Sequence, residues 1–356
     1  MKISIGYKVI DGPWGGGNSF VMSLKKALEL KGHTVVNDLE GSNIDIILII
    51  NPRYRRNPTT TFGARHILNY LIFKNPEAIV VHRINECDER KNTRSMNFKL
   101  RTINYLADHT VFIASWLMKL KVWRSESQHS VILNGASQEV FYPTKGEDWD
   151  KVKPLRLITH HWGGNIMKGF DVYSYIDKIL DDPKWSSKVE FTYVGNLPRN
   201  FSFKNVNHIK SLSGKNLGDC IRNHDVYLTA SINEPAGFHH IEGACCGLPL
   251  LYRNSGALPE YCDGFGIEFD GVTDIEEKLG MMMTRYDDFR KKIHEYPNTE
   301  NNRIPEWIKL FELLYSKKKK ISFSRRLWRN PLMPVSYTHL RAHETPEHLV
   351  CRLLLE

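Results

Sequence analysis

The chain has 356 residues, of which 41 % are hydrophobic and 25 % charged, and its formal net charge is +9. This balance is typical of a globular protein, and the length is enough for about two domains. No hydrophobic run approaches the roughly 18 residues that a membrane-spanning helix needs. The amino-terminal stretch MKISIGYKVIDGP indicates a strand and a turn rather than a signal peptide. We therefore expect a cytoplasmic protein.

The first part of the chain, 1–145, alternates between strand and helix patterns. Short runs rich in β-branched residues predict strands at 2–9, 33–37, 44–50, 78–84 and 109–115. Amphipathic stretches predict helices between them at 19–32, 64–74 and 95–107. This βαβ rhythm is typical of a parallel sheet with helices on both faces.

A polar stretch at 144–154 resembles a linker, and the same rhythm restarts after it. Strands are predicted at 155–161, 189–195, 206–212, 226–231, 249–253 and 266–269, and helices at 168–182 and 217–224. We predict an α/β protein of two tandem Rossmann-like, doubly wound domains that face each other across a cleft. Their ranges are 1–145 and 152–303, and a helix at 304–318 with Pro305 in its first turn follows them.

The last segment, VSYTHLRAHETPEHLVCRLLLE (335–356), has a foreign character. Its first half matches the translation of a common sequencing-library adapter, so we interpret it as a non-native tail. We leave it out of the fold prediction and assign no function to its histidines, to Glu344 or to Cys351.

Metal and nucleic-acid binding are not indicated by the residue pattern. The adjacent pairs His160-His161 and His239-His240 do not predict a metal site by themselves, because neighbouring side chains tend to point in different directions. The basic segment 317–329 is interpreted as a solvated tail, with attraction to anionic lipid or to a negatively charged acceptor as the alternative. Nucleic acid is not indicated, because the basic residues of the chain are not interleaved with stacking aromatics in any recognisable binding module. We expect no metal and no cofactor.

The stretch EPAGFHHIEGACCGLP (234–249) follows a predicted strand, where ligands of doubly wound sheets bind. Pro235 and Gly237 are poor helix-interior residues, so a turn should lead into a helix that contains Glu242. Amide groups at such a helix start attract phosphate, and Glu242 can accept hydrogen bonds from a ribose diol. Glu234 can reach another part of the same ligand. A capped helix with two solvated carboxylates has the same spacing and remains an alternative.

Two further loops favour a phosphate ligand. Three glycines, Gly15 to Gly17, follow the first strand and suit a phosphate-facing loop, although a plain flexible turn would also contain them. Lys168, in THHWGGNIMKGFDVY, is expected to open a helix after the first strand of the second domain. A lysine there can neutralise a diphosphate, and an ordinary surface lysine is the alternative.

On these residues the chain resembles the retaining glycosyltransferases of the GT-B fold, specifically glycosyltransferase family 4, over about residues 1–318. The most specific element is the Glu-x7-Glu motif from Glu234 to Glu242; SVILNGASQEVFYP, MKGFDVY and FTYVGNLP support it. The resemblance implies a nucleotide-diphosphate sugar as donor and transfer to a hydroxyl of a glycan or lipid-linked acceptor. No DxD motif follows a predicted strand, where it could hold a metal.

The resemblance also implies roles for single residues. Glu234 would lie beside the donor sugar, Glu242 would bind the ribose and Lys168 would bind the diphosphate. The amides of Gly237 and Phe238 would also help to bind the diphosphate. Gly16 and Gly17 of the first domain would close over the phosphates.

One position departs from the family pattern. The family has an arginine five or six residues before the lysine, where this chain has Gly163 and Trp162. The group that replaces it is expected to be Asn165, a histidine of the HHW run, or an arginine that reaches across, such as Arg199 or Arg253.

The stretch VVHRINECDER supplies the first-domain candidates. His82 and Arg83 end a predicted strand, so we expect both to face the cleft. The resemblance implies a cleft histidine that contacts the donor sugar or the acceptor, and His82 is the candidate; a histidine bonded within its loop is the alternative. Three nearby carboxylates are candidates for acceptor hydroxyls or plain loop charges: Glu86, Asp88 and Glu89.

Two other functional classes remain open. A nucleotide-sugar epimerase or a phosphorylase can use the same two-domain fold, and an epimerase would need no acceptor. A nucleotide-sugar-binding protein without turnover is the non-enzymatic alternative, and the missing arginine favours it.

Overall fold

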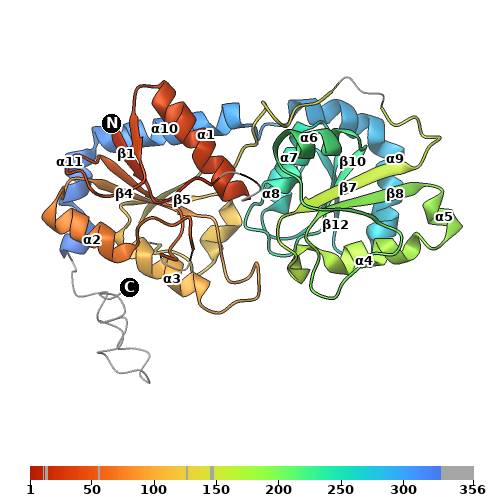
Figure 1. The fold of residues 1–356 in the computed structure, drawn as a ribbon, viewed down its shortest axis with the longest axis horizontal. Helices are drawn as coiled ribbons and strands as arrows, with labels where there is room; N and C mark the ends of the chain where they lie inside the picture. Colours follow the sequence, from red (N-terminus) through yellow and green to blue (C-terminus); the bar gives the residue numbers. More distant parts are fainter. Residues whose placement is uncertain (11, 13–14, 55–56, 126, 145–147, 330–356) are drawn as a thin grey trace.

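A computed structural model describes residues 1–10, 12, 15–54, 57–125, 127–144 and 148–329. The expected non-native tail at 335–356 and part of the expected linker lie outside the described residues. Two α/β halves lie side by side, each with a central sheet flanked by helices (Figure 1). They correspond to the two sheets into which the strands are grouped.

The first sheet is parallel, with the strand order β2-β1-β3-β4-β5-β6. Its strands are β1 (Lys2–Ile5), β2 (Thr34–Val36), β3 (Ile46–Ile49), β4 (Ile79–Ile84), β5 (His109–Phe112) and β6 (Gln128–Val131). The main connecting helices are α1 (Gly16–Leu30), α2 (Ala64–Phe73) and α3 (Met96–Ile103). Every strand except β6 lies within a predicted one. The pattern did not predict β6 because QHSV is a short, largely polar edge strand.

The second sheet is also parallel, with the order β12-β11-β10-β7-β8-β9. Its strands are β7 (Leu155–His161), β8 (Val189–Gly195), β9 (Asn207–Ile209), β10 (Val226–Thr229), β11 (Leu250–Arg253) and β12 (Gly266–Phe269). The helices are α4 (Phe170–Ile179), α5 (Pro183–Ser186), α6 (Gly214–Arg222), α7 (His239–Cys245), α8 (Leu258–Cys262) and α9 (Ile275–Lys292). The prediction of two doubly wound α/β units is confirmed.

The central strands are continuous apolar runs because both of their faces are buried. All residues of β3 and of β10 are buried, as expected where helices cover both faces of a parallel sheet. The pattern did not predict α9, because its sequence IEEKLGMMMTRYDDFRKK is rich in charged residues and its buried side is narrow.

The chain returns to the first half at its carboxyl end. Helix α10 (Glu300–Ser316) packs against α1, and the ring centroids of Trp307 and Phe20 are 5.1 Å apart. Helices α11 (Lys318–Phe323) and α12 (Arg326–Arg329) then continue along the first sheet's side (Figure 1).

Part of the basic segment 317–329 is therefore structural rather than a solvated tail. Lys318 Nζ lies 2.9 Å from Asp45, and the buried guanidinium of Arg325 donates from Nε to Asp108 at 2.8 Å. These ion pairs fasten the segment to the first domain, so the interpretation as a solvated tail is wrong for these two residues. The side chains of Lys319 and Lys320 are exposed.

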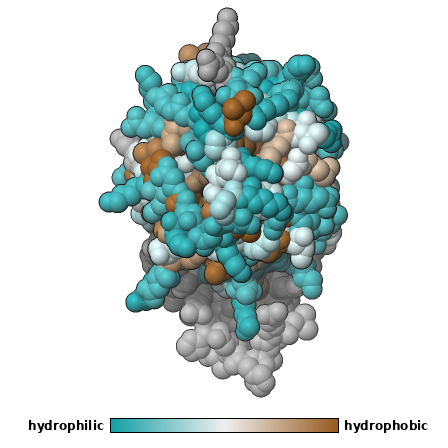
Figure 2. All heavy atoms as spheres, turned by 90° about the vertical axis from the view of Figure 1, so that its right-hand side faces the viewer, coloured by the Kyte–Doolittle hydropathy of each residue, from teal (hydrophilic) through white to brown (hydrophobic). Residues whose placement is uncertain are grey.

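Within the described residues, no helix is both long and apolar enough to cross a lipid bilayer. Figure 2 looks at the outer side of the second half, where hydrophilic residues predominate and hydrophobic ones are scattered.

Candidate functional site

The carboxyl ends of both sheets face one cleft of about 1380 Å³. Parallel strands bring their carboxyl ends to one edge, so loops distant in sequence meet there. The predicted site residues that line the cleft are Glu234, Glu242, Lys168, Gly237, Phe238, Asn165, Gly16 and Gly17.

An ion pair lies on the second-domain wall. Lys168 Nζ is 2.5 Å from Glu234 Oε2, and Glu234 is only 2 % exposed. Burial raises the pKa of Glu234, but the positive charges of Lys168 and Arg90 outweigh it and lower the pKa to about 2. Glu234 is therefore a carboxylate at neutral pH.

The backbone around Lys168 differs slightly from the prediction. Lys168 ends a short 3-10 turn (Ile166–Lys168) and α4 begins two residues later, so it does not open a helix itself. Gly169, with φ of 99°, makes the turn into α4, and a Cβ there would lie 2.4 Å from that of Ala230. Only glycine fits, which fixes Lys168 beside the end of β10.

The second motif carboxylate is oriented by a histidine. Glu242 lies in the first turn of α7, and its Oε2 is 2.7 Å from Nε2 of His160 at the end of β7. The other ring nitrogen of His160 is 2.9 Å from the Tyr227 hydroxyl. We assign the tautomer in which Tyr227 donates to Nδ1 and Nε2–H donates to Glu242. Sequence reasoning missed this link, because 82 residues separate its two ends.

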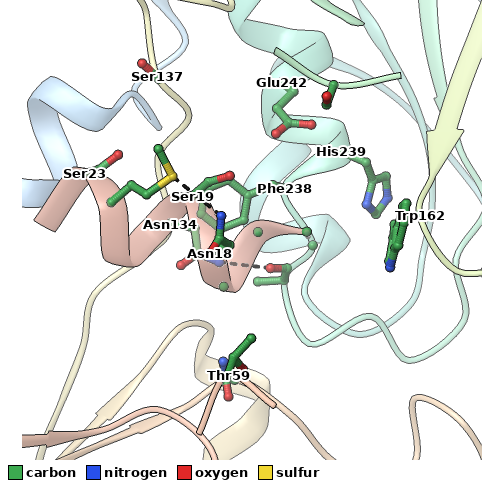
Figure 3. A pocket seen from close by; sticks show the side chains of 18 of the residues that line it. Asn18, Ser19, Ser23, Thr59, Asn134, Ser137, Trp162, Phe238, His239 and Glu242 are labelled. Atoms are coloured by element: carbon green, nitrogen blue, oxygen red, sulfur yellow. Dashed lines mark hydrogen bonds between the residues drawn. The ribbon is translucent and has the colours of Figure 1, made fainter. Parts of the chain in front are cut away.

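The two domains touch at Gly16 and Phe238. A Cβ built on Gly16 would lie 2.1 Å from Cδ2 of the Phe238 ring, whereas one built on Gly17 would have no heavy atom within 4 Å. Figure 3 shows Phe238, at the start of α7, beside Asn18 of α1. A side chain at position 16 would therefore disturb this contact between the walls.

At the position of the missing arginine, Trp162 and Gly163 line the cleft. Trp162 is 49 % exposed, lines the cleft, and lies beside His239 in Figure 3. Asn165 uses its Oδ1 to accept from the amide of Met167 at 2.8 Å, so it caps the turn before Lys168.

The two arginines expected to reach across lie elsewhere. Arg253 pairs with Asp171 at 2.8 Å, and Arg199 is exposed. In the part of the chain that the structure describes, neither arginine lines the cleft.

His82 does not line the cleft, and the prediction that it faces it is wrong. It is fully buried in β4, where its Nδ1 lies 3.1 Å from Nδ2 of Asn104, and burial lowers its pKa to about 3. Successive side chains of a strand point to opposite faces, so His82 and Arg83 cannot both point the same way. Arg83 is the one that lines the cleft.

The first-domain wall carries further cations that the sequence did not single out. Arg90 Nη1 lies 3.1 Å from both oxygens of Glu86, and Arg53 Nη2 lies 3.6 Å from Glu86 Oε2. All three residues line the cleft. Glu86 is thus a buried partner of two arginines rather than a plain loop charge.

The other two carboxylates of this stretch stabilise the local backbone. Asp88 accepts from the amides of Met96 and Asn97 at the start of α3, at 2.8 and 2.9 Å. Glu89 accepts from the side chain of Asn97 at 3.0 Å. These contacts account for both carboxylates without a ligand.

Besides His160, two more of the paired histidines form hydrogen bonds inside the second domain. His161 Nε2 is 2.9 Å from the Tyr173 hydroxyl, and His239 Nε2 is 2.8 Å from Thr229 Oγ1. Among the described residues, no three His, Cys, Asp or Glu side chains are grouped so that they could hold a metal ion.

No protein-family model matches the chain, and no curated protein matches its sequence. Solved structures do match its fold. Sucrose-phosphate synthase from Thermosynechococcus elongatus aligns with a TM-score of 0.62 and 14 % identity, over 88 % of this chain and 99 % of that one. A glycosyltransferase from Rickettsia africae gives 0.61 and 12 %, over 88 % and 98 %.

HepE from Anabaena, solved in complex with UDP-glucose, aligns with a TM-score of 0.59 and 12 % identity, over 87 % of this chain and 99 % of that one. At identities this low the likeness shows the fold alone. Together with the two parallel six-stranded sheets, it shows that the chain has the two-domain GT-B fold.

Proposed function

We propose that the protein is a retaining glycosyltransferase of the family 4 type, which transfers a sugar from a nucleotide-diphosphate sugar to a hydroxyl group. One observation carries the proposal: Glu234 and Glu242 line the same cleft of a GT-B fold as Lys168, which lies 66 residues before Glu234. Glu234 is paired with Lys168 and Glu242 with His160, so each motif carboxylate has a fixed orientation.

The second domain holds the donor nucleotide in this proposal. His160 occupies one oxygen of Glu242, and the other oxygen accepts hydrogen bonds from the ribose hydroxyls. Lys168 neutralises the diphosphate, and the backbone at Gly237 and Phe238 faces the same space. Because HepE was solved with UDP-glucose, uridine nucleotides are the first donors to test.

The reaction breaks the bond between the anomeric carbon and the diphosphate and forms one to the acceptor oxygen on the same face of the sugar. Negative charge develops on the leaving diphosphate, and Lys168 stabilises it without need for a metal. The leaving phosphate takes the proton of the acceptor hydroxyl. Glu234, ionised at neutral pH, accepts a hydrogen bond from the sugar and stabilises positive charge at the anomeric carbon.

The acceptor, a glycan or a lipid-linked sugar, enters from the first-domain wall. We place the protein in the cytoplasm, with peripheral contact to a membrane through residues 317–329. Phe323 in this segment is 90 % exposed, and the exposed Lys319 and Lys320 precede it. An exposed aromatic ring beside lysines suits an anionic lipid surface.

A nucleotide-sugar-binding protein without turnover is the second candidate. The observation that favours it is the replacement of the family arginine by Gly163 and Trp162. An epimerase remains distinguishable by its product, because it changes the sugar without an acceptor.

The test starts with a thermal-shift screen of UDP-, GDP-, ADP- and dTDP-sugars, since a ligand of the folded state raises the melting temperature. The donor found is then incubated with acceptor glycans in EDTA. We expect nucleotide diphosphate release that depends on the acceptor, and a product with the donor's anomeric configuration. Glu242→Ala should weaken nucleotide binding by about tenfold to a hundredfold, since it removes charged hydrogen bonds to the ribose.

The other outcomes separate the alternatives. An altered sugar with no acceptor indicates an epimerase, and binding with no release indicates a binding protein. An inverted product contradicts the retaining mechanism, and loss of transfer in EDTA contradicts metal independence. A nucleotide affinity that survives Glu242→Ala contradicts the ribose contact.

A further inference from the structure

Arg83 is a buried cation, and its partners among the described residues are neutral groups. It is 1 % exposed, and its guanidinium lies 4.0 Å from the centroid of the Phe20 ring. Nη2 donates to Asn134 Oδ1 at 2.9 Å, and Nη1 donates to the amide oxygen of Asn85 at 2.8 Å in the orientation that satisfies both groups. Nε has no partner. Burial lowers the pKa of Arg83 to about 9, so it still carries its charge at neutral pH.

Buried charges are normally paired, because leaving water costs several kcal/mol per ion. Arg325 follows this rule, since it is equally buried and pairs with Asp108. Among the described residues, no carboxylate forms an ion pair with Arg83, although Arg83 lines the cleft. This contrast points to a negative charge that comes from outside the chain.

The neighbours of Arg83 show where that charge would lie. Phe20, under the guanidinium, is one turn along α1 from Gly16. Asn134 bonds to Arg83 and also donates to the backbone oxygen of Ala236 at 2.9 Å, between Glu234 and Gly237. Arg83 therefore touches, directly or through Asn134, the first-domain and second-domain segments that face each other across the cleft.

We propose that Arg83 is the counter-charge for the diphosphate of the donor and replaces the arginine that is missing at positions 162 and 163. The second cation of the diphosphate site then belongs to the opposite domain, so the site is complete only while both walls enclose the nucleotide. The inference rests on the proposed function, because it takes a nucleotide diphosphate as the ligand of this cleft. Arg90 is the nearest rival, but it is already paired with Glu86.

The experiment compares a charged with an uncharged ligand of the same site. Calorimetry measures the binding of UDP and of uridine to the wild type, Arg83→Gln and Arg90→Gln; GDP and guanosine, or the pair matching the donor found, replace them if uridine is not the base. We expect Arg83→Gln to weaken UDP binding about tenfold to a hundredfold and to leave uridine binding within about twofold. Arg90→Gln, the matched control, should weaken UDP binding less.

Several results would overturn the inference. They are an unchanged UDP affinity in Arg83→Gln, an equal loss for UDP and uridine, or a larger loss in Arg90→Gln. If Arg83→Gln does not fold, Arg83→Met repeats the comparison with a side chain of similar length and no charge. Lys168→Met separates the two proposals: if it loses UDP affinity while Arg83→Gln does not, only the role of Arg83 fails. A wild type that binds no nucleoside diphosphate ends the proposed function as well.

Discussion

The charged side chains on the two walls of the cleft differ in how they are paired. On the second-domain wall Lys168 and Glu234 form a direct ion pair, and Glu242 is bound by His160. On the first-domain wall Arg83 has neutral partners, and Arg53 and Arg90 share the single carboxylate of Glu86. The second wall is thus internally compensated, whereas the first presents an excess of positive charge.

This difference suggests that the second wall recognises the ligand and that the first wall attracts its negative charge. A compensated wall holds groups in fixed orientations, which suits recognition of ribose and sugar hydroxyls. A wall with surplus positive charge raises the local concentration of anions and favours domain closure on them. Substitutions on the second wall should therefore affect both stability and binding, and substitutions on the first mainly binding.

The largest effect is expected from Lys168→Met. It leaves Glu234 buried without its nearest cation, and breaking a buried pair costs about 3–5 kcal/mol of unfolding free energy. Arg90 still attracts Glu234, so we expect the lower end of that range. Urea unfolding measures the loss, and calorimetry with UDP measures the accompanying loss of affinity.

The double variant Lys168→Met/Glu234→Gln is the matched control. With both charges removed, most of the lost stability should return, but the nucleotide affinity should stay low. A single Lys168→Met variant as stable as the wild type would contradict the buried pair and remove the contrast between the two walls.

The sequence predicted the second wall better than the first, for a physical reason. Glu234, Gly237 and Glu242 belong to one strand–turn–helix unit, so their spacing alone indicates that they share a strand end. Lys168 follows a strand of the same sheet and could be placed by the same rule. These positions need no knowledge of strand order.

The residues of the first wall could not be predicted from sequence spacing, because their positions depend on the orientation and the order of the strands. The orientation of β4 decides whether His82 or Arg83 points to the cleft. The prediction that both do was wrong, because only one of two successive side chains can. The contact of Arg53 with Glu86 requires that β3 and β4 be neighbours, and the contact of Glu242 with His160 joins residues 82 positions apart. The alternation of side chains along a strand would have excluded one of His82 and Arg83.

A smaller effect tests the contact between the walls. In Gly16→Ala the new methyl group would lie 2.1 Å from the Phe238 ring, so the walls must separate or the ring must move. We expect UDP affinity to fall about tenfold, because closure around the nucleotide becomes less favourable by about 1.4 kcal/mol. Calorimetry with UDP measures the effect, and small-angle scattering of the nucleotide-bound protein detects a more open form.

Gly17→Ala is the control for this substitution. It makes the same chemical change one residue later, where a Cβ would meet no heavy atom within 4 Å, and it should lower UDP affinity less than Gly16→Ala does. The additional substitution Phe238→Ala should relieve the clash in Gly16→Ala. Equal effects of the two glycine substitutions would show that helix propensity, not the contact between the walls, is responsible.

The smallest effect concerns His82, the first-domain residue whose predicted place was wrong. Burial lowers its pKa from 6.5 to about 3 in the folded protein. Between these values the unfolded chain binds the proton and the folded chain does not, so stability falls as pH drops through this window. At pH 5.5 this histidine should lower the unfolding free energy by about 1 kcal/mol relative to pH 7.5.

His82→Asn should remove that contribution, so urea unfolding at the two pH values should show a smaller difference in the variant than in the wild type. The slope with pH is the readout, because the substitution also leaves space in the core and lowers stability at every pH. His294→Asn makes the same substitution at an exposed position and is the matched control. A slope unaffected by His82→Asn would mean that His82 has the same pKa in the folded and the unfolded chain, which would contradict its burial beside Asn104. His82 would then have to lie nearer to the cleft, and the first wall would gain the histidine that the sequence predicted.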